Sequence, residues 1–71
     1  MTTLTGVIEY VDLEGGLWAI RCNDGRRLVL DDLPQELRVD GLKVELVGQE
    51  IASIGISMMG NTFCVERGRR L

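Results

Sequence analysis

Apolar and polar residues alternate with a period of two along most of this chain, and turn residues interrupt the alternation at short intervals. In the segment 42–47, three apolar side chains share one face and Lys43 and Glu45 share the other. This period is typical of a strand with one buried face. Nine glycines against a single proline fit frequent tight turns. The sequence therefore predicts an all-β fold.

The alternation divides the chain into six strand-like segments. The residues Asn23–Arg26, with the sequence NDGR, predict a tight hairpin between the second and third segments, because Gly25 can adopt the positive φ that the turn needs. Gly48–Glu50 and Gly60–Asn61 are predicted to be turns as well. Residues 67–71 are polar, and we expect them to form a flexible tail. The six expected strands are Leu4–Asp12, Leu17–Cys22, Arg27–Asp31, Leu42–Val47, Ala52–Met58 and a segment around Phe63–Val65.

A single helical turn is expected between the third and fourth strands. Asp32 is placed to cap this turn and Pro34 to open it, and Leu33 and Leu37 would cover one end of the sheet. Five or six strands with a helical turn at this point predict a small OB-like barrel, named after the oligonucleotide/oligosaccharide-binding fold. An SH3-like barrel is the alternative. Either closure removes exposed strand edges, which a chain this short can hardly leave open.

Length, charge and the missing residue types exclude several classes of function. We expect residues 1–71 to form one small domain with a net charge of −3, which disfavours binding to a phosphate backbone. The absence of histidine removes the commonest metal ligand and acid–base catalyst. Cys22 and Cys64 are too far apart in sequence for a metal knuckle, and we expect both to be reduced. No leader or membrane-spanning segment is visible, so a cytoplasmic location, no membrane partner and no cofactor are expected.

The turn between the first two strands is the first candidate contact surface. Its two glycines would let a partner approach the backbone, and Trp18 beside them is interpreted either as a core residue or as a binding platform. Tyr10 alternates with inward residues and is predicted to lie in the core. The candidate contact residues are Asp12, Glu14, Gly15, Gly16, Trp18 and Met59.

Three arginines form a second candidate surface. Arg21, Arg26 and Arg27 are expected to point outward from the second and third strands, where single-stranded nucleic acid binds many OB barrels. The stacking aromatics that such a site needs are predicted to point inward, which leaves nucleic-acid binding as the alternative function.

Catalysis and metal binding are not expected. Asp12 with Glu14, and Asp31 with Asp32, are the only paired carboxylates near strand ends, and such acids usually solvate turns. Calcium binding by Asp12, Glu14 and Asp31 would match no known loop spacing. The sequence thus predicts no enzyme, no catalytic residues and no metal site.

The segments TGVIEYVDLEGGLWAI and NDGRRLVLDDLPQELRVDGLKVEL carry a resemblance to a recurring small β-domain of uncharacterised bacterial and archaeal proteins. The shared features are a Leu-Glu-Gly-Gly-aromatic turn, an Asp-Gly hairpin and a Leu-Pro stretch followed by Asp-Gly-Leu. The resemblance implies an OB-like barrel and supplies no catalytic residues. We therefore expect a non-enzymatic binding or structural module with a protein or small-molecule partner.

Overall fold

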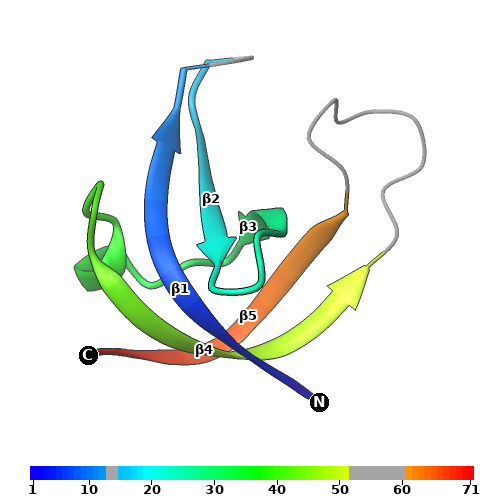
Figure 1. The fold of residues 1–71 in the computed structure, drawn as a ribbon. Coiled ribbons are helices and arrows are strands. Elements are labelled where there is room, and N and C mark those ends of the chain that lie inside the picture. Colours follow the sequence, from blue (N-terminus) through cyan, green and yellow to red (C-terminus); the bar gives the residue numbers. More distant parts are fainter. Residues whose placement is uncertain (13–14, 52–60) are drawn as a thin grey trace.

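Five strands form a closed barrel in the computed structural model, which describes residues 1–12, 15–51 and 61–71 (Figure 1). This confirms the expected all-β barrel with a helical turn between the third and fourth strands. The elements are β1 (Thr2–Val11), β2 (Leu17–Cys22), β3 (Arg27–Asp31), the 3-10 turn η1 (Gln35–Leu37), β4 (Lys43–Ile51) and β5 (Thr62–Arg70).

The strand order around the barrel is β1-β2-β3-β5-β4, and β4 pairs with β1 to close it. All neighbours are antiparallel except β3 and β5, which run parallel and therefore need a crossover connection. The predicted hairpin between β2 and β3 is confirmed. The Cys22 N–H donates to the Arg26 carbonyl over 2.7 Å, and Gly25 has a φ of 94°.

The barrel interior is filled by the inward positions of the alternating strands. The largest fully buried side chains are Phe63, Ile8, Ile20, Leu46 and Val44. Leu33 and Leu37 belong to the same core cluster and cover it next to η1, as predicted.

The helical turn is only three residues long and lacks the side-chain cap that the sequence predicts. Pro34 precedes η1, and no side chain caps it, so the prediction that Asp32 is the cap is wrong. Asp32 instead takes a φ of 59°, which redirects the chain as it leaves β3. No other helical segment occurs among the described residues, and no described helix has the length and apolar character to cross a membrane.

A register shift between β4 and β5 corrects two predictions. Gly48 pairs with Val65 while Val47 pairs with Arg67, so Glu66 is an extra residue in β5. A Cβ at Gly48 would collide with the Cys64 carbonyl oxygen, so this glycine permits the close approach of β5. The predicted turn at 48–50 is wrong because these residues continue β4. The predicted tail is wrong because residues 67–70 pair with β4.

Smaller differences concern the sheet faces. β1 pairs with β2 in an unbroken register from Gly6 to Val11, so both faces of β1 keep a strict alternation there. Strict alternation from Leu28 and Leu30 would place Val29 on the outer face and expose it, but Val29 is buried, as is its cross-strand neighbour Ala19. The expected strand at 52–58 lies outside the described residues.

We predict that Ile20→Val destabilises the protein by about 0.5–1.5 kcal/mol, because Ile20 is fully buried in the core. Val39→Ala is the control, since Val39 is exposed and its truncation should change stability by less than about 0.5 kcal/mol. Chemical denaturation followed by circular dichroism measures both. An equal loss in the two variants would contradict the assignment of Ile20 to the core.

Candidate functional site

Tyr10 and Trp18 form the outermost of three inward-facing layers between β1 and β2. The two layers beneath are the cross-strand pairs Gly6–Cys22 and Ile8–Ile20, both buried. Tyr10 is 48% exposed and Trp18 is half-buried, so this layer lies at the mouth of the barrel. The prediction that Tyr10 is a core residue is wrong, because the ladder with β2 ends one residue later and leaves Tyr10 at the open end of the barrel.

The two rings meet edge to face. Their centroids are 5.1 Å apart and their planes make an angle of 65°. Such a pair contributes about 0.5–1.5 kcal/mol beyond the area it buries. Trp18 also packs against the core cluster. Trp18 is therefore only partly a core residue, since it packs against the core cluster and remains partly exposed beside Tyr10. Its interpretation as a binding platform stays a prediction.

Backbone contacts hold Tyr10 in place. Its N–H donates to Asp40 Oδ1 over 2.9 Å, and the neighbouring Gly41 N–H donates to the Ile8 carbonyl over 2.7 Å. Gly16 has a φ of 105°, and a Cβ there would collide with the Tyr10 hydroxyl. Gly16 is thus required for the position of the phenol. We refer to Tyr10, Gly16 and Trp18 as the aromatic mouth.

The remaining predicted contact residues are only partly placed. Asp12 is exposed directly after β1, and Gly15 is exposed with a φ of 88° in open surroundings. Glu14 and Met59 lie outside the described residues. The accessibility of Tyr10 was not predicted, although its position near the end of an expected strand was a signal. Asp40 was not predicted either, because it is 30 residues away and is brought to Tyr10 only by the fold.

Two of the three candidate arginines share one carboxylate. Arg21 and Arg27 are cross-strand neighbours on β2 and β3. Arg21 Nε lies 3.0 Å from Glu9 Oε1, and Arg27 Nη2 lies 3.0 Å from Glu9 Oε2. Glu9 thereby links three strands on the outer surface and removes part of the positive charge expected there.

Arg26 lies between two acids. Its Nε is 3.0 Å from Asp24 Oδ2, and its Nη1 is 3.4 Å from Glu50 Oε1. The backbone N–H of Arg26 donates to Asp24 and holds the pKa of that carboxyl below its ordinary value, while Asp24 raises the pKa of Arg26. The three candidate arginines therefore face three carboxylates, so the patch carries no net charge.

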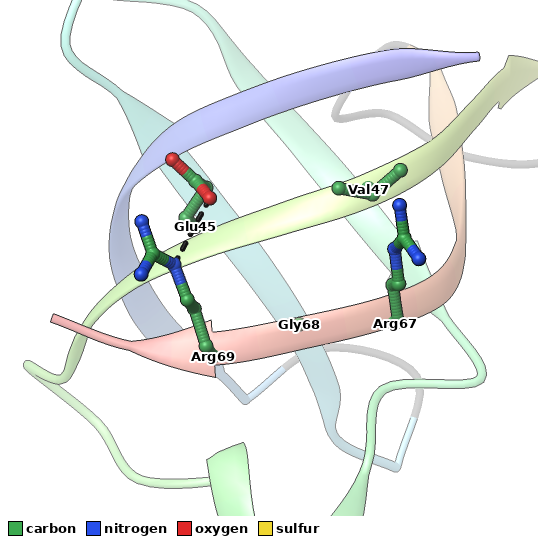
Figure 2. A pocket seen from close by; sticks show the side chains of 5 residues that line it. All are labelled: Glu45, Val47, Arg67, Gly68 and Arg69. Carbon is green, nitrogen blue, oxygen red and sulfur yellow. Dashed lines mark hydrogen bonds and ion pairs between the residues drawn. The ribbon is translucent and has the colours of Figure 1, made fainter.

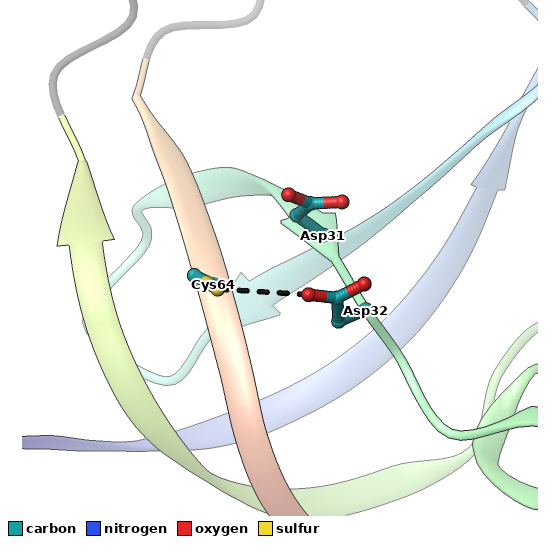
Figure 3. A group of neighbouring side chains, drawn as sticks. All are labelled: Asp31, Asp32 and Cys64. Carbon is teal, nitrogen blue, oxygen red and sulfur yellow. Dashed lines mark hydrogen bonds between the residues drawn. The ribbon is translucent and has the colours of Figure 1, made fainter.

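Asp31, Asp32 and Cys64 form a cluster that the sequence did not predict (Figure 3). The parallel pairing of β3 with β5 places Asp31 opposite Cys64, and the Cys64 thiol lies 3.9 Å from Asp32 Oδ2. Desolvation, followed by the charges of Asp32 and Asp31, raises the pKa of the thiol. Because a thiol must lose its proton to bind a metal, this shift opposes coordination. Both aspartates are exposed, as solvated acids usually are.

Comparisons with models of protein families, with curated proteins and with solved structures found no match to this chain. The resemblance to small bacterial and archaeal β-domains therefore stays a prediction. The aromatic mouth is therefore the candidate site on the basis of its geometry alone. It is a partly exposed pair of aromatic rings, and the backbone of Tyr10 is fixed by a hydrogen bond to Asp40.

We predict that Tyr10→Ala makes Trp18 more accessible to solvent, because the phenol ring packs against the indole. The fluorescence of this single tryptophan should shift to longer wavelength, and iodide should quench it more strongly. Tyr10→Phe keeps the ring and should leave both properties close to those of the wild type. Unchanged quenching in Tyr10→Ala would contradict the observed ring contact.

Proposed function

We propose that this chain is a non-enzymatic binding module whose contact surface is the aromatic mouth, with a protein or a small molecule as its partner. The observation that carries the proposal is a half-exposed tyrosine that is nevertheless held in place by Asp40 and Trp18. Tyrosine and tryptophan are enriched in contact surfaces because they offer a large area at a low cost in side-chain entropy. A tyrosine positioned before binding lowers that cost further.

We also propose that the barrel is OB-like rather than SH3-like. The strand order β1-β2-β3-β5-β4 and the position of η1 between β3 and β4 support this assignment. OB barrels bind their ligands over strands 2 and 3 and through the loops that connect strands 1 with 2 and 4 with 5. The aromatic mouth lies where β1 connects to β2, which agrees with that surface.

A non-enzymatic role is supported by the chemistry of the acids. Asp31 and Asp32 are both exposed and lack the burial with which active sites adjust a general acid or base. The chain also contains no histidine that could transfer protons near neutral pH.

Nucleic-acid binding through Arg21, Arg26 and Arg27 is the weaker proposal. Each of these guanidinium groups already contacts a carboxylate, which a phosphate would have to displace. The net charge of −3 adds long-range repulsion.

Selection of displayed peptides on the immobilised protein, followed by fluorescence titration, tests the proposed contact surface. We expect Tyr10→Ala to weaken the selected peptides by at least about tenfold, as is usual for a central aromatic contact. Val39→Ala is the matched control, because Val39 is equally exposed at 48% and lies outside the aromatic mouth.

Equal binding of the selected peptides to wild type and Tyr10→Ala would show that the aromatic mouth is not the contact surface. A labelled single-stranded oligonucleotide, titrated at low ionic strength, forms the second arm. Binding that survives Tyr10→Ala and is lost in Arg21→Gln would favour the nucleic-acid alternative.

A further inference from the structure

A second surface lies on the outside of β4 and β5, where two arginines border a shallow groove of about 290 Å³ (Figure 2). Figure 2 shows both guanidinium groups on the same side of the sheet, with Arg69 beside Glu45 and Arg67 beside Val47. The groove is lined by Glu45, Val47, Arg67, Gly68 and Arg69.

The bulge at Glu66 explains why these arginines point outward. Before it, Phe63 and Val65 face the core; without the extra residue, Arg67 would continue on their face. After the bulge Gly68 faces inward, where a Cβ would collide with Leu46 and Leu37 side-chain atoms at 2.5 and 2.8 Å. The groove is therefore a consequence of how β5 is joined to the barrel.

The two arginines retain unused donors. Glu45 Oε1 accepts a hydrogen bond from Arg69 Nε over 3.0 Å, and the terminal nitrogens of Arg69 have no bonding partner among the described residues. Arg69 is 69% exposed in its side chain. Arg67 lies opposite Val47 and forms no ion pair with any carboxylate in the described part of the chain. The guanidinium groups of both arginines can therefore donate hydrogen bonds to an external anion.

The charge of this face is opposite to that of the whole chain. Lys43, Arg67 and Arg69 stand against Glu45 and the exposed Glu66 on the outer surface of β4 and β5, which gives a local charge of +1, whereas the chain carries −3. Unlike Arg21, Arg26 and Arg27, which face three carboxylates, these groups retain a positive excess. This surface attracts anions over roughly the Debye length of about 8–10 Å.

The spacing of the two arginines favours an extended peptide. Alternate residues of a strand lie on one face about 6.4–6.8 Å apart, and acidic side chains at alternate positions of an extended peptide have the same repeat. Arginine binds carboxylates in a planar, two-pronged geometry. Glu45 within the groove repels a phosphate dianion more strongly than a single carboxylate.

We propose that the β4–β5 groove binds an extended acidic segment of a partner protein, with carboxylates at alternate positions that pair with Arg67 and Arg69. This site is separate from the aromatic mouth and does not depend on the function proposed for it.

The test is a titration of a fluorescein-labelled peptide with alternating glutamate and serine residues, followed by anisotropy at low and at physiological ionic strength. We expect Arg67→Gln and Arg69→Gln each to weaken binding by about threefold, and the double variant by about tenfold. Arg70→Gln is the matched control: it removes the same charge from the same strand, but its cross-strand partner is the inward-facing Val44. Tyr10→Ala should bind like the wild type.

Loss of binding in Arg70→Gln equal to that in Arg67→Gln would overturn the proposal, because net charge alone would then explain the attraction. Binding of a glutamine–serine peptide with the same affinity would also overturn it. Stronger competition by inorganic phosphate or by an oligonucleotide than by the unlabelled acidic peptide would assign the groove to phosphate groups instead. Circular dichroism verifies that each variant is folded.

Discussion

The parallel pairing of β3 with β5 is the contact on which the rest of this structure depends. It consists of three residue pairs, Val29–Thr62, Leu30–Phe63 and Asp31–Cys64. Without it the other four pairings would leave an open sheet with two free edges, β3 and β5, and a small domain exposes such edges at the risk of aggregation. Closure also buries Phe63, the largest fully buried side chain of the core. Figure 1 shows β5 running from β3 across to β4, so a single strand completes the barrel.

β5 pairs in parallel with β3 over residues 62–64 and antiparallel with β4 along most of its length, and the bulge at Glu66 interrupts the pairing with β4. The extra residue reverses the inward and outward phase of β5, and Gly48 and Gly68 allow the backbones and the core leucines to come close. The same bulge brings Arg67 and Arg69 to the outer surface. The basic groove is thus coupled to the closure of the barrel, which explains how an acidic chain presents a positive face at this position.

The arginines near β2 and β3 differ from those of β5 because of the side chains that the fold places beside them. Glu9 and Arg27 are far apart in sequence, and they meet only because β1, β2 and β3 are neighbours. The arginines predicted as a nucleic-acid surface are therefore neutralised by carboxylates. Arg67 and Arg69, which were expected to lie in a flexible tail, carry the excess positive charge. Tyr10 shows the same effect for an aromatic ring, since its exposure depends on where the ladder with β2 ends.

The sequence by itself determined the local features of this protein. The bounds of β2 and β3, the positive φ of Gly25, the burial of Leu33 and Leu37 and the place of the helical turn all follow from residue type and from a period of two within short windows. The tertiary structure alone decided the length of β4, the ordered pairing of residues 67–70, the exposure of Tyr10 and the burial of Val29. Each of these depends on which strand lies alongside and in what register, and the pairing energy comes from residues remote in sequence. A glycine such as Gly48 has the same local signature in a turn and in a bulge, so only the approach of β5 distinguishes them.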